Sequence, residues 1–118
     1  MNYSIIIFFL ILIFLNKNIE NFEIISSGEA KKLISQNKIK TILDVRSNNE
    51  WNKGHHPKAI NIPIEPKNNI TKNSIKNLKE PILIYCRSGR RAKNAAKLMK
   101  KFNFNKIFII NDNYKSIL

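Results

Sequence analysis

The sequence predicts an α/β domain built on a parallel sheet that helices cover on both faces. Two observations support this fold class. Short, continuous apolar runs rich in Ile recur along residues 22–110, and segments with helical spacing stand between them. Strands of a parallel sheet that is covered on both faces read as continuous apolar runs, without polar alternation. The alternation of such strands with helices is typical of parallel α/β folds.

Five apolar runs are the expected strands. They are, in chain order, "FEII", "TILDV", "AINIP", "ILIYC" and "KIFII", at 22–25, 41–45, 59–63, 82–86 and 106–110. Pro63 ends the third run, and Pro81 directly precedes the fourth. Proline is tolerated at strand ends because no ladder hydrogen bond is lost there.

Four segments between these runs are expected to be helical. Ser26 and Glu29 form a capping-box pattern that begins a helix at 26–35. The expected elements that follow are a short helical turn that Gly54 closes, a polar helix and an amphipathic helix, at 48–54, 71–80 and 90–102. The last of these has its apolar residues at the i, i+3, i+4, i+7 spacing of one helix face.

The first twenty residues form a separate segment. Residues 5–15 are an unbroken apolar run, which is short for a membrane span of about 20 residues but suits the apolar region of a secretory signal. Only the terminal amine supplies positive charge before the run, and no A-x-A-like cleavage site follows it. We expect residues 1–20 to be a signal peptide or an uncleaved anchor that associates with a membrane through residues 5–15. The protein is then exported, periplasmic or anchored facing the envelope, in preference to cytoplasmic, with 22–118 as its single domain.

The basic charge does not indicate a nucleic-acid partner. Lys and Arg outnumber Asp and Glu by 21 to 8, which gives a formal net charge of +13. The lysines are spread along the chain, and there is no interleaving of aromatic and basic residues for stacking on bases. We expect a monomeric protein with a solvated basic surface that draws small anions toward it.

Cys86 is the only cysteine, and its surroundings indicate a reactive thiol. It cannot form an internal disulfide, and with two histidines it is too small a set for a zinc motif. It follows the fourth expected strand, at the edge where ligands bind in parallel α/β folds. Gly89 lets successive N–H groups turn toward an anion, and the helix after it points its positive end there. Three arginines in "CRSGRR" complete surroundings that favour the nucleophilic thiolate over an inert, space-filling thiol.

Two segments resemble a known family. "CRSGRRA" is similar to the active-site loop of single-domain rhodaneses, the thiosulfate sulfurtransferases. "ILDVRSNNEWNKGHHPKAINIP" resembles the family pattern of a D-V-R strand end, then E-[WYF], then G-H-[IL]-x-G-A-x-[NH]-[IL]-P. The resemblance implies the rhodanese-like fold, a five-stranded parallel sheet flanked by helices on both faces. It also implies that Cys86 takes a sulfane sulfur from thiosulfate or a similar donor, becomes a persulfide, and passes the sulfur to cyanide or a thiol, without a cofactor or metal.

The resemblance also assigns roles within the cysteine loop. The backbone N–H groups of Arg87, Ser88, Gly89, Arg90 and Arg91 would stabilise the persulfide anion. The first and last of these arginines would also steer the sulfonate oxygens of the donor.

Four residues outside the loop are expected to support it. Asp44 and Arg46 would brace the loop from the end of the second strand. Glu50 would pair with Arg91, the arginine that closes the loop. His55 would hydrogen-bond the backbone, since an ionised cysteine needs no general base.

Several positions depart from the family pattern. His56 stands where the family has an aliphatic residue, and we expect it to be half-exposed and without a function. Lys58 replaces a turn glycine. Asn111, Asp112 and Asn113 stand where the family has a Gly-Gly pair, and we expect them to tolerate positive φ there. Because the sequence stops at residue 118, we expect the last helix to be short.

Two alternatives stay open. A Cdc25-like phosphatase or arsenate reductase would share the fold but use a C-x5-R loop, wide enough for a tetrahedral anion. In this chain Ala92 occupies that arginine position and Arg91 gives C-x4-R, so loop length favours sulfur chemistry. The other alternative is a domain that relays persulfide sulfur, or binds a partner, without acting on thiosulfate. A relay needs the same residues, whereas the retained cysteine and arginines argue against a purely binding domain.

Overall fold

A computed structural model describes residues 2–19, 22–76, 79–104 and 106–118. Its centre is a sheet of five parallel strands in the order β1-β5-β4-β2-β3. The predicted fold class and the five predicted strands are confirmed. The strands are β1 (Phe22–Ile25), β2 (Thr41–Asp44), β3 (Ala59–Asn61), β4 (Ile82–Tyr85) and β5 (Ile107–Ile110).

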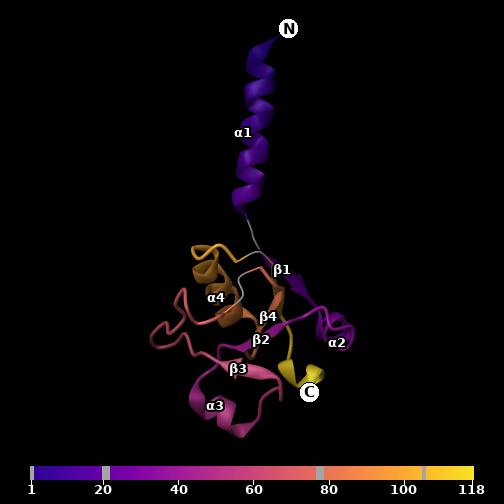
Figure 1. The fold of residues 1–118 in the computed structure, drawn as a ribbon, viewed down its shortest axis with the longest axis vertical. Coiled ribbons are helices and arrows are strands. Elements are labelled where there is room, and N and C mark those ends of the chain that lie inside the picture. Colours follow the sequence, from indigo (N-terminus) through magenta and orange to yellow (C-terminus); the bar gives the residue numbers. More distant parts are fainter. Residues whose placement is uncertain (1, 20–21, 77–78, 105) are drawn as a thin grey trace.

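Helices cover both faces of the sheet (Figure 1). Helix α4 (Arg90–Lys100) packs its buried face, which includes Met99, against one side of the central strands. Helix α2 (Ser27–Ser35) and the 3₁₀ helix η1 (Tyr114–Ile117) cover the other side. Every side chain of β4 and β5 is buried, as expected for continuous apolar strands between two layers.

The helix boundaries follow from local capping. Ser26 accepts a hydrogen bond from the Glu29 N–H and begins α2 where the sequence predicts it. Helix α3 (Asn48–Lys53) ends at Gly54, as predicted, and begins with a complete capping box between Ser47 and Glu50. This second capping box was not among the expected features. It fixes the carboxylate of Glu50 at the start of a helix, close to the end of β2.

The helix predicted at 71–80 is wrong for the residues that the structure describes there. Residues 71–76 and 79–80 form turns and bends, and residues 77 and 78 lie outside the described ranges. Ile75 enters the core from this segment. The Ile70 N–H donates to Asn68 Oδ1 and the Thr71 N–H donates to Ser74 Oγ, and such short side chain to backbone hydrogen bonds compete with helix formation.

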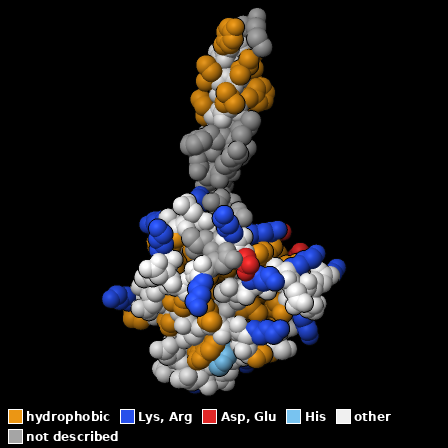
Figure 2. Space-filling model, viewed as in Figure 1, with side chains coloured by type: hydrophobic (Ala, Val, Ile, Leu, Met, Phe, Trp, Pro, Cys, Tyr) orange, Lys and Arg blue, Asp and Glu red, His pale blue; other side chains and the backbone are white. Residues whose placement is uncertain are grey.

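The N-terminal helix α1 (Tyr3–Ile19) stands away from the sheet (Figure 1). Its described side chains are largely apolar and exposed, including Tyr3 and Ile5 through Leu12, and they form the uppermost apolar region in Figure 2. In the described part of the chain, no helix combines the length and apolar character needed to cross a membrane. A signal peptide or anchor in this segment stays a prediction.

Candidate active site

Cys86 lies directly after β4, at the carboxyl edge of the sheet, and its side chain is buried. Its Sγ accepts hydrogen bonds from the Gly89 N–H at 3.0 Å and from the Ala92 N–H at 3.4 Å. Ala92 is the third residue of α4, so its N–H is one of those that lack a partner within a helix. The two donors and the positive helix end all favour negative charge on the sulfur.

Gly89 gives the loop its shape. Its φ is 100°, in the left-handed region, and it is the N-cap of α4. A Cβ at this position would lie 3.0 Å from Asn111 Cα, at the end of β5. The loop therefore needs glycine both for its backbone conformation and for the close approach of the neighbouring chain segment.

The arginines of the loop differ in their exposure and in their partners. Arg87 and Ser88 are exposed. Arg90 is also exposed and donates to both oxygens of Glu65, at 2.6 and 3.2 Å, which raises the pKa of Arg90. The Arg90 side chain thus binds Glu65, in the segment after β3.

Arg91 forms the ion pair with Glu50 that the sequence led us to expect. Its two terminal nitrogens donate to the two carboxylate oxygens at 2.6 and 3.0 Å. The hydrogen bond from Arg91 is the main cause that lowers the pKa of Glu50 to about 2, with help from Ser47, and the same bond raises the pKa of Arg91. A bidentate pair of this kind fixes the start of α4 against the start of α3.

Asp44 and Arg46 form a buried ion pair, with 2.7 Å between the Asp44 Oδ2 and the Arg46 Nη2. Arg46 Nη2 also donates to the Gly54 carbonyl at 2.7 Å, and the guanidinium lies 4.0 Å from the centre of the Tyr114 ring. Burial lowers the pKa of Arg46, but the hydrogen bond and charge of Asp44 outweigh it, so the pKa is raised. These contacts join the end of β2 to the end of α3 and to η1.

The two histidines have different environments. His55 stacks on Trp51 at a ring distance of 3.3 Å, and its Nδ1 lies 2.8 Å from the Trp51 carbonyl oxygen, which is the backbone contact expected for it. The expectation of a half-exposed His56 is wrong, because this residue is buried. The backbone N–H of His56 donates to the Tyr85 hydroxyl, and the ring Nδ1 accepts a hydrogen bond from the backbone N–H of Lys58. The second bond stabilises the turn in which Lys58 replaces the family's glycine. Burial lowers the pKa of His56, and the nearby charge of Lys58 lowers it further.

The turn after β5 does not use positive φ, contrary to expectation. Of the described non-glycine residues, only Asn37 and Asn103 have positive φ. Asp112 instead accepts hydrogen bonds from the N–H and hydroxyl of Ser27, at the start of α2. The polar residues in place of the family's glycines therefore attach the C-terminal segment to a helix that is distant in sequence.

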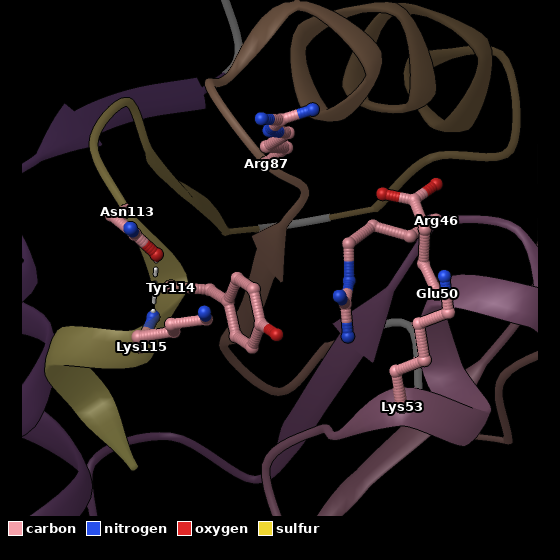
Figure 3. A pocket seen from close by; sticks show the side chains of 7 residues that line it. All are labelled: Arg46, Glu50, Lys53, Arg87, Asn113, Tyr114 and Lys115. Carbon is pink, nitrogen blue, oxygen red and sulfur yellow. Dashed lines mark hydrogen bonds between the residues drawn. The ribbon is translucent and has the colours of Figure 1, made fainter.

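A pocket of about 340 Å³ opens beside the cysteine loop. Figure 3 shows side chains reaching it from the cysteine loop, from the segment between β2 and the end of α3, and from the C-terminal segment. The lining residues are Arg46, Glu50, Lys53, Arg87, Asn113, Tyr114 and Lys115.

Four of these lining residues were not predicted from the sequence to belong to the site: Lys53, Asn113, Tyr114 and Lys115. Only Lys53 carried a usable signal, because it lies three positions after Glu50 on the same short helix. The other three come from a segment whose position depends on tertiary packing.

Comparison with known proteins relates these features to a family. Residues 26–118 match the model of the rhodanese-like domain. The chain is 33% identical over 96 residues to the protein named "Putative sulfur carrier protein YrkF" of Bacillus subtilis (strain 168), covering 78% of this chain and 49% of YrkF. It is 28% identical over 91 residues to the "Uncharacterized protein YibN" of Escherichia coli (strain K12), covering 76% of this chain and 63% of YibN. The chain thus spans only part of the length of these relatives, 49% of YrkF and 63% of YibN.

The solved structures show the same fold. The human single-domain sulfurtransferase TSTD1 superimposes with a TM-score of 0.61 at 21% identity, over 78% of this chain and 91% of TSTD1. The cysteine loop, the strand order and the family match over residues 26–118 agree with one another. This chain belongs to the rhodanese-like domain family.

Proposed function

We propose that the protein is a sulfurtransferase that works through a persulfide on Cys86. The Cys86 thiolate attacks the sulfane sulfur of thiosulfate, the sulfur–sulfur bond of the donor breaks, and sulfite leaves with the electron pair. The persulfide anion on Cys86 is then attacked at its outer sulfur by an acceptor such as cyanide, which leaves as thiocyanate and restores the thiolate. Covalent catalysis of this kind divides one transfer into two displacements.

The observation that carries the proposal is the environment of the Cys86 Sγ. Two backbone N–H groups, from Gly89 and Ala92, already point at the sulfur. Donors placed in this way stabilise the thiolate before attack and again when it leaves. The cationic pocket beside the loop supplies a place for the anionic part of the donor.

The structure gives less support to a phosphatase. Ala92 stands where a C-x5-R loop has its arginine, and the Ala92 N–H is already within bonding distance of the sulfur. Arg91 is held by Glu50. The position of the arginine and the length of the loop thus both differ from those of a loop that binds a tetrahedral phosphate.

A sulfur relay is the second candidate, and one observation favours it. YrkF, to which the chain is 33% identical, carries the name of a sulfur carrier. A relay would use the same Cys86 persulfide but would receive sulfur from a protein persulfide in place of thiosulfate.

The test is to incubate the protein with thiosulfate and measure the intact mass. We expect the addition of one sulfur atom, and its removal as thiocyanate when cyanide is added, with no addition in Cys86→Ser. No thiosulfate-dependent thiocyanate, or the same activity in Cys86→Ser, would refute thiosulfate transfer. Loading by a protein persulfide alone would establish the relay, and hydrolysis of an aryl phosphate at a comparable rate would support the phosphatase.

We also propose that residues 1–20 direct the domain to the cell envelope, as a cleaved signal or a retained anchor. The apolar, exposed side chains at the N-terminal end of α1 support this proposal. N-terminal sequencing of the protein from fractionated native cells tests it. An intact N-terminus in the cytosolic fraction would contradict export.

A further inference from the structure

Acidic and basic side chains are divided between the two edges of the sheet. All five strands are parallel, so their carboxyl ends share one edge and their amino ends share the other. Most of the described acidic residues lie at or beside the carboxyl edge, at strand ends or at helix starts: Glu29, Asp44, Glu50, Glu65 and Asp112. Away from that edge, the described ranges hold only Glu23 and Glu80 as acidic residues.

Lysines mark the amino edge instead. Lys40, Lys58 and Lys106 directly precede β2, β3 and β5, and Lys101 is the C-cap of α4. All four are exposed. The amino edge therefore carries an excess of positive charge, whereas the acidic residues are concentrated at the opposite edge.

Helix α1 leaves the domain from this amino edge. It ends at Ile19, shortly before β1, and Phe22 of β1 pairs with Ile107 of β5. Lys106 thus lies one residue from the strand position beside the exit of α1. Its Nζ lies 5.2 Å from the centre of the Phe108 ring, on the face of the sheet that α2 covers. In Figure 1, α1 projects from one end of the domain, while α3 and η1 lie at the other end.

Two more exposed lysines lie on the opposite face of the sheet, at the end of α4. Lys97 and Lys101 are four positions apart, so they share one side of this helix. Residues 102–106 connect them to β5, the strand next to β1. Together with Lys106 they form the amino-edge patch, and none of the three forms an ion pair in the part of the chain that the structure describes. Figure 2 shows Lys and Arg side chains on the domain directly below α1.

The apolar part of α1 has a length that suits one leaflet of a bilayer. Residues 5–15 are all apolar, and the side chains from Ile5 to Leu12 are exposed. As an α-helix these residues extend about 16 Å, which is roughly half of the hydrocarbon thickness of a bilayer. A short apolar anchor binds a membrane firmly when a second attraction is added, and basic residues near anionic headgroups supply one.

We propose that α1 enters one leaflet of a membrane and that the amino-edge patch binds the anionic lipid headgroups around it. The domain then stands with the Cys86 loop, at the carboxyl edge, turned away from the bilayer and toward solutes in the aqueous phase. The inference rests on the proposal that residues 1–20 direct the domain to the cell envelope, with α1 as the retained anchor. It does not depend on the reaction of Cys86.

The binding test mixes the full-length protein with vesicles of phosphatidylcholine alone, or of phosphatidylcholine and phosphatidylglycerol in equal parts, and measures the fraction that sediments with them. We expect the anionic vesicles to bind the protein at least about tenfold more tightly. A triple variant that changes the patch lysines to Gln should lose about tenfold or more of this binding, and its binding to phosphatidylcholine should not change.

The matched control is a triple variant with the same loss of charge at the other end of the sheet: Lys58→Gln, Lys67→Gln and Lys72→Gln. These exposed lysines lie before β3 or in the segment after it. Strand β3 is four strand spacings from β1, or about 19 Å, which exceeds the Debye length of about 8–10 Å. The control should lose less than about threefold. An equal loss in the two triple variants, or equal binding of the unmodified protein to both kinds of vesicle, would overturn the proposal.

Lysine acetylation of the unmodified protein tests the orientation. On anionic vesicles we expect Lys97, Lys101 and Lys106 to be acetylated at least about fivefold more slowly than in solution, as measured by peptide mass. Lys53 and Lys115, at the carboxyl edge, should react at unchanged rates. Equal protection of these two lysines would refute the orientation. Protection of the patch by polyglutamate but not by the vesicles would assign it to an acidic protein partner and would also overturn the proposal.

The outcomes separate this inference from the proposed targeting. If N-terminal sequencing shows that α1 is removed in cells, the targeting proposal stands and the retained anchor is refuted. If the chain is intact and cytosolic, the targeting proposal fails, while the vesicle assay still decides whether the patch binds anionic lipid.

Discussion

The Cys86 sulfur is contacted by backbone donors, while the Arg91 side chain beside it is held in an ion pair. Backbone N–H groups of Gly89 and Ala92 contact the sulfur directly, so these contacts depend on the geometry of the loop and of the helix start. Arg91 forms an ion pair with Glu50, which keeps its positive charge at one position beside the cysteine loop. The ion pair therefore stabilises the structure of the site. Its contribution to the free energy of unfolding can be measured through the titration of Glu50.

The Glu50–Arg91 pair predicts a specific pH dependence. The hydrogen bond from Arg91 lowers the pKa of Glu50 from 4.5 to about 2 in the folded protein. A carboxylate with a lowered folded pKa stabilises the fold above its unfolded pKa, and this contribution is lost as the pH falls through the folded pKa. We expect Glu50→Gln to cost about 1 kcal/mol of unfolding free energy near neutral pH, allowing for the partial exposure of the pair.

The measurement is urea denaturation of both proteins between neutral pH and pH ~2. The difference between them should shrink below pH 4.5. Glu65→Gln is the control, because its pair with Arg90 is exposed to solvent and should show a much smaller pH-dependent difference. A Glu50→Gln deficit that stays constant with pH would contradict this account.

Between elements, the decisive contact is that of the cysteine loop with the end of β5. Gly89 begins α4 in a left-handed conformation and lies against Asn111. The same segment continues to Asp112, which accepts two hydrogen bonds from Ser27 of α2. Loop, strand end and helix start are thus fixed together at one edge of the sheet.

Substitution of Gly89 tests this arrangement. We expect Gly89→Ala to lower the unfolding free energy by at least about 1 kcal/mol. The φ of 100° at this position is unfavourable for alanine, and the new Cβ would crowd the Asn111 backbone. Sulfur loading of Cys86 should fall with it, because the Gly89 N–H would move from the sulfur.

Gly28→Ala is the matched control for the glycine change. Gly28 lies in α2, and a Cβ there would meet only Ser26 Oγ, at 3.9 Å. We expect this variant to be stabilised by about 0.5 kcal/mol, with loading unchanged. Equal stability of Gly89→Ala and the unmodified protein in urea denaturation would contradict the role given to Gly89.

Across the whole molecule, the positive net charge and the cationic pocket both attract small anions. The chain has a formal net charge of +13, and Lys and Arg side chains are spread over the face of the domain in Figure 2. Such a field raises the local concentration of small anions and is screened by salt.

The expected consequence is a salt-dependent loading rate. The second-order rate constant for loading by thiosulfate should fall several-fold between ~20 and ~300 mM KCl. Discharge by neutral 2-mercaptoethanol should change less than about twofold over the same range. Stopped reactions analysed by intact mass give both constants, and an equal response of the two reactions would show that the basic surface does not steer the donor.

Features that depend on local chemistry could be predicted from the sequence alone. Continuous apolar runs predicted the five strands, because burial on both faces removes polar alternation. The cysteine loop was also evident, since its glycine, its arginines and the helix after it are consecutive in the chain. The helix predicted at 71–80 is absent from the described residues, where the Asn68 and Ser74 side chains accept hydrogen bonds from nearby backbone N–H groups.

The surroundings of the Cys86 loop depend on contacts between segments that are distant in the sequence. The burial of His56 depends on the Tyr85 hydroxyl, 29 residues away, and the C-terminal turn depends on Ser27, 85 residues from Asp112. The pocket joins Lys53, Arg87 and Lys115 from three elements. No local pattern encodes such an encounter, because it follows from how the parallel strands and their helices pack. The position of Cys86 at the carboxyl edge of the sheet could therefore be predicted from the sequence, whereas the residues that line the pocket beside its loop could be found only from the fold.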